Sequence, residues 1–257
     1  MSAGRVVAVV GWHAHGYRRM WRGTVTVSFV NPLLFLVALG VLLGSLVDEN
    51  DPDLGGLTYL EFVAPALIAT TAMQTAASAT TYPVKAGLKW WRTYHAVVST
   101  PVRVGELVAG VLGWAGVRIL VAAGIFTAVA GAGGAFVSPL AVLAPAAALL
   151  CGLAFGALLA FICARVDDDE WLAAIYRWGL VPLFLFSGTF FPIEQLPNWL
   201  EPVAWLTPLW HGVELCRDLC TGTLDATSTT VHVVYLVSVT AVCSVLAARA
   251  CGRILQR

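Results

Sequence analysis

Long runs of apolar residues alternate along this chain with short polar connections. Six of these runs are long enough to cross a bilayer as an α-helix, because about 20 residues rising about 1.5 Å each span the hydrocarbon core. They cover residues 25–47, 59–82, 104–130, 140–164, 171–191 and 231–250. The pattern predicts an all-α membrane protein with six transmembrane helices. No connection is long enough for a separate domain, so we expect a single transmembrane domain over residues 1–257.

The composition agrees with a membrane location. Hydrophobic residues make up 59% of the 257 residues and charged residues 12%, whereas about a quarter of a soluble domain is charged. Fifteen Lys and Arg balance fifteen Asp and Glu, so no overall basic field favours nucleic acid as a partner. The six cysteines are scattered, and we expect neither a disulfide framework nor a zinc site. Cys216 and Cys220 are expected to be thiols.

The first apolar run is expected to stay as a span, because it is too long for a signal-peptide core and lacks a clear cleavage site. The distribution of basic residues sets the orientation. Lys and Arg gather before the first run, between the second and third, after the fourth and at the chain end, as at Arg18, Lys89, Arg165 and Arg253. Basic loops stay on the cytoplasmic side. Both termini are therefore predicted to be cytoplasmic, in a bacterial plasma membrane.

The N-terminal segment, residues 1–24, has helical periodicity without being a span. Val6 and Val10 fall on one arc of a helix, and Arg18 and Arg22 fall on another. This pattern predicts an amphipathic interface helix lying on the membrane. Simple anchoring by basic residues and interfacial tryptophans explains the composition equally well.

The loop at residues 83–101 repeats this arrangement between the second and third runs. Lys85, Lys89 and Arg92 share one face of a helix over residues 84–98, with aromatic side chains opposite. Positive-inside anchoring explains the composition of this loop, but it does not explain why the periodicity persists. We therefore expect a cytoplasmic helix here.

A different segment lies on the outer side, at residues 191–229. Prolines divide it into pieces too short to span, yet tryptophans keep it at the level of the lipid headgroups. The prolines are Pro192, Pro197, Pro202 and Pro208. We expect an extracellular re-entrant helical segment that covers a pathway, because non-helical backbone in a membrane has to be buried in protein or line a wet cavity. An interfacial hairpin that only packs is the alternative.

Catalytic motifs are missing from the sequence. Lys85 and Lys89 are followed by Ala86 and Trp90, so neither ends a phosphate-binding loop. No serine has the glycine flanks of a hydrolase elbow. The histidines are placed so that no two are expected to face each other within the bilayer as a metal or haem would require. They are His13, His15, His95, His211 and His232. We expect no catalytic residue, no metal and no cofactor in this chain.

Polar residues inside the predicted spans are few. Thr70, Gln74, Ser78 and Thr81 recur at helical spacing along the second run, which indicates a stripe that faces protein or water. Hydrogen bonding between helices that only holds the bundle together is the alternative. Arg118 lies midway along the third run, where a charge is costly and is a functional candidate by default.

Small residues and one proline also mark the predicted spans. Asn31 and Pro32 open the first run with a possible kink and an amide. Two G-x-x-x-G pairs permit close helix contact. These pairs are Gly40 with Gly44 and Gly152 with Gly156.

Two outer motifs complete a distinctive order of features. They read S-G-T-F-F-P-I-E-Q-L-P at residues 187–197 and L-T-P-L-W-H-G-V-E-L-C-R at residues 206–217. Together with the basic N-terminal helix, Asn31-Pro32 and the basic aromatic loop, they resemble the type 2 ABC transporter (ABC-2) permeases. The resemblance covers nearly the whole chain. It is strongest to the branch of nodulation-factor lipooligosaccharide exporters and daunorubicin-resistance permeases, which links the chain to efflux and antibiotic resistance.

The resemblance implies a permease dimer, with a homodimer expected, in which each subunit docks a separate cytoplasmic ATPase that binds ATP and Mg. It implies an ATPase-coupling helix with Lys85, Lys89, Trp90, Trp91, Arg92 and Tyr94. A second cytoplasmic contact would comprise Arg165, Asp167, Asp168, Asp169 and Glu170. The substrate path would include Asn31, Thr70, Gln74, Ser78, Thr81, Ser187, Thr189, Phe190 and Phe191.

The function implied is the ATP-driven export of an amphiphile, such as a glycolipid, a lipid-linked saccharide or a hydrophobic drug. Membrane lipids are the other expected partner. The pathway of hydroxyls and aromatic groups suits an amphiphile better than an ion, which needs rings of charge or carbonyls. A secondary transporter, which should show an internal repeat, and an intramembrane enzyme are the alternatives.

Overall fold

A computed structural model describes residues 2–18, 34, 36–38, 56–195, 197 and 199–256. Within these residues the regular secondary structure is helical throughout, as predicted. In chain order the elements are α1 (Ala3–Tyr17), α4 (Tyr59–Thr80), α5 (Tyr82–Lys85), η2 (Ala86–Trp90), α6 (Thr93–Val98), α7 (Val104–Ala132), η3 (Pro139–Leu143), α8 (Ala144–Arg165), α9 (Glu170–Ala174), η4 (Ile175–Leu180), α10 (Val181–Phe186), η5 (Ile193–Gln195), α11 (Glu201–Trp205), α12 (Pro208–Thr221) and α13 (Ala226–Leu255).

Four helical stretches are long and apolar enough to cross a membrane. They are Tyr59–Trp90, Val104–Ala132, Pro139–Arg165 and Ala226–Leu255. They correspond to the predicted second, third, fourth and sixth spans, so the helices and their order in these regions were predicted correctly.

The first and fifth predicted spans are not among these four helices. The fifth, 171–191, corresponds to α9, η4 and α10, whose helical turns end at Phe186 and rise about 25 Å in all. The first, 25–47, lies almost wholly outside the described residues, as does Asn31. The described residues therefore establish four candidate spans, and the total of six stays a prediction.

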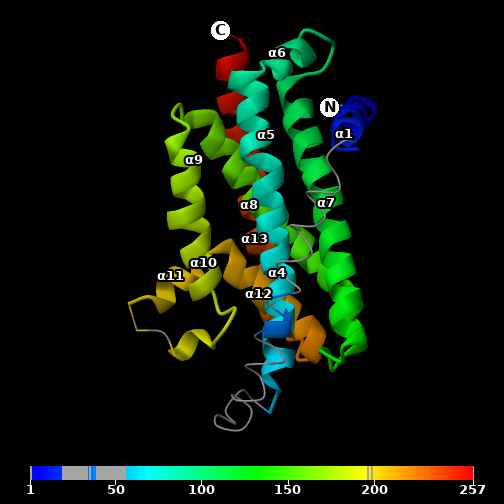
Figure 1. The fold of residues 1–257 in the computed structure, drawn as a ribbon, viewed down its shortest axis with the longest axis vertical. Helices are drawn as coiled ribbons and strands as arrows, with labels where there is room; N and C mark the ends of the chain where they lie inside the picture. Colours follow the sequence, from blue (N-terminus) through cyan, green and yellow to red (C-terminus); the bar gives the residue numbers. More distant parts are fainter. Residues whose placement is uncertain are drawn as a thin grey trace.

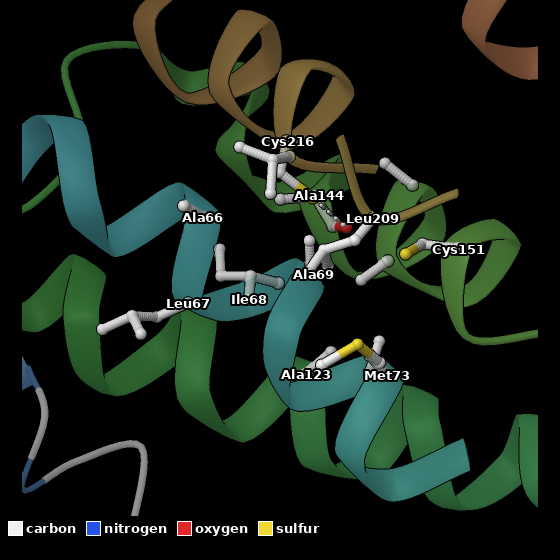
Figure 2. Packing of buried hydrophobic residues seen from close by; sticks show 14 of the residues in the cluster. Ala66, Leu67, Ile68, Ala69, Met73, Ala123, Ala144, Cys151, Leu209 and Cys216 are labelled. Atoms are coloured by element: carbon white, nitrogen blue, oxygen red, sulfur yellow. Dashed lines mark hydrogen bonds between the residues drawn. The ribbon is translucent and has the colours of Figure 1, made fainter. Parts of the chain in front are cut away.

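Helix α4 forms the centre of the bundle. It runs vertically between α7 on one side and α9 and α10 on the other, with α8 and α13 behind (Figure 1). In its most apolar stretch 89% of the residues are buried, against 22% in α13. The residues that α4 buries include many alanines, so its backbone approaches its neighbours closely. Figure 2 shows Ala66 and Ala69 of α4 facing Leu209 and Cys216 of α12.

Local sequence signals fix where several helices begin. Thr58 and Glu61 form a capping box at the start of α4, in which each side chain accepts a hydrogen bond from the other residue's backbone amide. Thr207 caps α12 by accepting from the amide of Trp210 at 3.3 Å, and Asp225 caps α13. These caps satisfy amides that have no partner within the helix.

Glycines of α8 bring it against α4. A Cβ atom at Gly152 would lie 3.1 Å from the carbonyl oxygen of Ala72 and 2.6 Å from the side chain of Ile119. At Gly156 a Cβ atom would lie 3.5 Å from the side chain of Thr80. The predicted G-x-x-x-G pair in α8 therefore lies at a close helix contact. The pair at Gly40 and Gly44 is outside the described residues.

The N-terminal helix α1 packs on α7. Val9 fills the space above Gly110, where a Cβ atom would be 2.5 Å from the valine side chain. The buried carboxylate of Glu106 accepts from the amide of Ser2 at 2.7 Å and lies 3.5 Å from the guanidinium of Arg5. Both chain ends and α6 lie at the same end of the molecule, and α12 lies across the other (Figure 1).

The predicted cytoplasmic helix over 84–98 is divided into two pieces. Its first half, α5 and η2, continues α4 with little interruption. Arg92 then adopts a left-handed conformation with φ of 52°, and α6 follows. Lys85 and Lys89 still share one face, but Arg92 does not belong to it. The break arises because a residue with positive φ cannot continue a right-handed helix.

The outer segment consists of short pieces, as its prolines predicted. Between Phe186 and α13 the described part contains η5, α11 and the 14-residue α12. Gly222, with φ of 83°, ends α12 in the left-handed conformation that glycine adopts readily. Whether these pieces re-enter the membrane stays a prediction.

We predict that Gly152→Leu disrupts the contact between α4 and α8. The added side chain would meet backbone and the branched Ile119, and overpacking of this kind costs about 1–3 kcal/mol or more. Thermal unfolding of the purified protein in detergent should show a lowered Tm.

Gly124→Leu is the matched control, because nothing lies within 4 Å of a Cβ atom placed on that glycine of α7. An equal loss of Tm in both variants would contradict the close contact at Gly152.

Candidate functional site

Two lysines join the predicted coupling segment to the loop after α8. The Lys85 ammonium, 1% exposed, donates to the carbonyl oxygens of Val166 at 2.9 Å and Asp167 at 2.6 Å, and lies 3.4 Å from the Asp169 carboxylate. Lys89 donates to the carbonyl of Val166 at 2.9 Å and to the Asp167 carboxylate. The hydrogen bond from Lys89 lowers the pKa of Asp167.

The two predicted ATPase contacts are therefore parts of one surface at the α6 end. Lys85 and Tyr94 are buried within it, and the Tyr94 ring occupies the space above Gly87, where a Cβ atom would be 2.6 Å from the ring. Lys89 is partly buried. The exposed members are available to a partner protein. They are Trp90, Trp91, Arg92, Arg165, Asp167, Asp168, Asp169 and Glu170.

The polar stripe on α4 separates into two kinds of residue. Thr70 and Thr81 are buried, and the Thr70 hydroxyl donates to the carbonyl of Ala66 in its own helix at 2.9 Å. Gln74 and Ser78 are exposed. These last two line a cavity of about 290 Å³ between α4 and the η4–α10 helix, which we call the α4–α10 cavity.

Apolar groups form most of the α4–α10 cavity. The lining side chains are Thr71, Met73, Gln74, Thr75 and Ser78 from α4 and Tyr176, Leu180, Val181 and Phe184 from the facing helix. A mostly apolar cavity with a few polar groups is typical of a site for a small amphiphilic molecule.

The two outer motifs meet in space. Arg217, at the end of the second motif, donates to the carbonyl of Gly188 in the first at 2.7 Å, and its guanidinium lies 4.1 Å from the ring centre of Phe62 on α4. The hydroxyls of Ser187 and Thr207 are 3.2 Å apart. These contacts attach the turn after α10 to α12 and α4.

The residues predicted from the first outer motif lie in this turn. Ser187 and Thr189 are buried, whereas Phe190 and Phe191 are half-buried. Ser187 lines a separate cavity of about 230 Å³ between α10 and α11. None of the four lines the α4–α10 cavity, which contains only residues of α4, η4 and α10 among those described.

Arg118 contacts the polar stripe. Its guanidinium Nη2 donates to the hydroxyl of Ser78 at 3.0 Å and lies 5.1 Å from the ring centre of Tyr17. Sequence reasoning did not place these partners together. Trp114 is one turn before Arg118 and Tyr82 one turn after Ser78, so spacing of four residues was the signal that could have found this aromatic surrounding.

His211 and His232 face each other where α12 meets the start of α13, a contact that the sequence analysis did not anticipate. Their Nδ1 atoms are 2.7 Å apart, so one ring donates to the other, and both rings are buried. Tyr235 stacks on His211 with ring centres 3.9 Å apart. Burial and the neighbouring His232 lower the pKa of His211 to about 4. The pair joins α12 to the start of α13, a contact that spacing along the chain could not reveal.

Neither this pair nor the cysteines form a metal site. No cluster of three or more His, Cys, Asp or Glu side chains occurs among the described residues. Cys216 and Cys220 are free, buried thiols, and Cys216 donates to the carbonyl of Ala144 at 3.7 Å (Figure 2).

A helical bundle with long apolar helices, an exposed polar and aromatic surface at one end and an amphiphilic cavity inside has the parts that a membrane transport subunit needs. The profile of the ABC-2 type transporter family matches residues 8–220. The chain belongs to the ABC-2 type transporter family.

Individual relatives agree with this assignment. Nodulation protein J of Rhizobium leguminosarum bv. trifolii is 30% identical over 233 residues, which are 86% of this chain and 87% of the relative. Nodulation protein J of Rhizobium meliloti (strain 1021) is 29% identical over 80% of this chain and 77% of its own length. The inner membrane transport permease YadH of Escherichia coli (strain K12) is 25% identical over 93% and 92%.

The chain is thus an integral membrane permease subunit of an ABC exporter. Subunits of this kind transport and do not hydrolyse ATP, bind no cofactor themselves and work with an ATPase subunit. The predicted family is confirmed, and the alternatives of a secondary transporter and an intramembrane enzyme are set aside.

We predict that Lys85→Met lowers the Tm of the purified permease more than Lys89→Met. Lys85 is buried, and its removal takes a charged donor from the carbonyls of Val166 and Asp167. A hydrogen bond to a charged group contributes about 1.5–3 kcal/mol. Lys89 is 20% exposed and its partner Asp167 is 90% exposed, so that pair contributes about 0–1 kcal/mol. Equal shifts of Tm in the two variants would contradict the conclusion that Lys85 is the residue that mainly holds the loop after α8 against α5.

Proposed function

We propose that this permease exports an amphiphile, such as a glycolipid or a lipid-linked saccharide, as a homodimer driven by a cytoplasmic ATPase. The resemblance to lipooligosaccharide exporters supports this class of substrate. The α4–α10 cavity supports it as well, because Gln74 and Ser78 offer hydrogen bonds within a wall that is otherwise mostly apolar.

One observation carries the proposal: a single helical rod connects the cavity to the exposed end. Helical turns run from Tyr59 to Trp90, so Ser78 in the cavity wall lies about 20 Å along the rod from Trp91. A push on the exposed end would therefore move the cavity wall. This is the geometry that coupling of nucleotide binding to transport needs.

We propose that the ATPase docks on Trp91 and Arg92 together with Asp168 and Glu170. All four are exposed. Lys85 and Lys89 would act inside the subunit by fixing the α8–α9 loop to the rod, so that both contacts move as one. This interpretation assigns the two lysines to force transmission and not to the interface itself.

Orientation and dimerisation belong to the same proposal. The shared end of α6 and the two termini would face the cytoplasm, as the basic residues indicate. The helix that walls the cavity exposes Trp178, Val181 and Leu185 to its surroundings. We propose that a second copy of the chain covers part of this face, with lipid on the rest.

Mechanistically, ATP would close the two ATPase subunits, and their closed state would favour an outward-facing arrangement of the permeases. Differential binding of nucleotide to the two states supplies the driving free energy. In this chain the rod α4–η2 and the helix η4–α10 would move relative to each other, which opens or closes the α4–α10 cavity.

We predict that Arg92→Asp uncouples ATP hydrolysis from export. The substitution reverses the charge while Asp tolerates the left-handed conformation that residue 92 adopts. Transport of fluorescent glycolipid should be measured in proteoliposomes that contain the permease and its ATPase. We expect a loss of about tenfold or more, in the range of coupling free energies of 1–3 kcal/mol, with the permease still folded.

Arg253→Asp is the matched control, because Arg253 of α13 is an exposed arginine at the same end of the molecule (Figure 1) and is not one of the residues assigned to the docking surface. Unchanged transport and ATP hydrolysis in Arg92→Asp would remove the assigned docking role. ATP-independent transport by the permease alone would contradict the proposed function.

We predict that Gln74→Leu slows transport without disturbing ATPase docking, because it removes the amide group from the wall of the α4–α10 cavity. Initial export rates and co-purification of the ATPase measure the two effects. Thr70→Val serves as control, since Thr70 bonds within its own helix and does not line the cavity. A wild-type rate in Gln74→Leu would show that the substrate does not pass this wall.

A further inference from the structure

A second, larger cavity lies on the other side of Ser78. It has a volume of about 580 Å³ and is formed by α1, by α4 with its continuation into η2, and by α7. The only permanently charged side chain among its described lining residues is Arg118. We call it the Arg118 cavity.

Aromatic rings make up most of the wall of the Arg118 cavity. They come from all three elements and are Trp12, Tyr17, Tyr82, Trp90, Trp91 and Trp114. The Tyr17 and Trp114 rings meet edge to face at 5.4 Å, next to the guanidinium. Indole and phenol groups offer apolar surface together with N–H and O–H donors, which suits a molecule that lies partly in lipid and partly in water.

The charge of Arg118 has no carboxylate partner in this cavity. None of the described ion pairs includes Arg118, and no Asp or Glu is among the lining residues. Residues 19–47, most of which lie outside the described ranges, contain no Asp or Glu. The hydrogen-bond partners that the structure gives Arg118 are both neutral hydroxyls, those of Ser78 and Tyr17. A guanidinium deep in a span that keeps further donors unused favours an anion.

The Arg118 cavity adjoins the proposed transport path. Ser78 lines both cavities. The Tyr82 ring of one cavity stacks on the Tyr176 ring of the other, with ring centres 6.1 Å apart. A thin partition of Ser78, Arg118 and the two tyrosines therefore separates the two spaces. Trp90 and Trp91, at the end of the rod that we assign to ATPase docking, line the same cavity as Arg118.

We propose that the Arg118 cavity is an anion-binding site, which takes the phosphate or carboxylate head group of a single-chain or lipid-linked amphiphile from the inner half of the membrane. Arg118 binds the anion, the aromatic rings surround the head group, and the alkyl chain stays in lipid. Resting on the proposed function, this defines the exported substrate as an anionic amphiphile that waits here before it enters the α4–α10 cavity. The same chemistry is offered by an anionic phospholipid of the membrane.

Binding of hexadecyl phosphate to the full-length permease in phosphatidylcholine nanodiscs tests the site. Four tryptophans line the cavity, so the change in tryptophan fluorescence reports occupancy. We expect saturable binding, with hexadecanol, which lacks the anion, binding at least tenfold more weakly. Arg118→Gln should raise the Kd for hexadecyl phosphate about tenfold or more, as expected for loss of a charge-assisted contact.

Control variants separate charge recognition from folding. Arg118→Lys keeps the charge and should bind within a few-fold of wild type. Arg177→Gln removes an exposed arginine of η4 that does not line the cavity, and its Kd should not change. Should Arg118→Gln fail to fold, Trp90→Ala tests the wall and should weaken binding several-fold. Equal binding of hexadecyl phosphate and hexadecanol, or wild-type affinity in Arg118→Gln or in Trp90→Ala, overturns the proposal.

Two further arms identify the source of the anion. If the ligand is the exported substrate, hexadecyl phosphate should stimulate ATP hydrolysis by the permease–ATPase complex in an Arg118-dependent way, and phosphatidylglycerol should not displace it. If the ligand is a membrane lipid, phosphatidylglycerol should displace hexadecyl phosphate without any effect on ATP hydrolysis. Either result supports the anion site. The binding measurement needs no ATPase, so failure of the complex to transport would count against the proposed function and leave the site standing.

Discussion

Close contact between α4 and its neighbours is the constraint on which the rest of the structure depends. Water does not drive helices together within a lipid core, so packing of small residues has to do so. Alanines along α4 and Gly152 of α8 allow this approach. A helix that is packed on several sides moves as a rigid body. The exposed end of the helix Tyr59–Trp90 and the part of it that lines the α4–α10 cavity can therefore move together.

Polar side chains then add specific ties at the ends of this apolar framework. At one end Lys85 and Lys89 hold the loop after α8, and at the other Arg217 holds the turn after α10. Each cation satisfies backbone carbonyls that a loop would otherwise leave without partners. Two segments that the resemblance treats as separate contacts, the loop after α4 and the loop after α8, thereby become one surface.

Helix positions were predictable from the sequence because apolar length decides them, and residues 104–130 anticipated α7 to within two residues. The outer pieces followed from their prolines. The break at Arg92 was not predictable, since nothing in a basic aromatic run announces a positive φ. The candidate site shows how far periodicity reaches: Gln74 and Ser78 line a cavity, whereas Thr70 and Thr81 satisfy the same periodicity and are buried. Their part in a substrate path stays a prediction. The spacing of the polar residues on α4 does not show which of them line a cavity and which are buried against other helices. The partners of Arg118 come from three helices, so only the fold assembles them.

The histidine pair has a consequence for the end of the bundle at which α12 lies. Two imidazoles joined through their Nδ1 atoms share one hydrogen, and a proton on each ring would set two N–H groups against each other at 2.7 Å. The lowered pKa of His211, about 4 against its usual 6.5, means that the folded pair resists protonation. Its stabilisation is complete above about pH 6.5 and is lost as the pH falls toward 4. Acid would therefore loosen α12 from α13, and with it the turn after α10 that Arg217 of α12 holds.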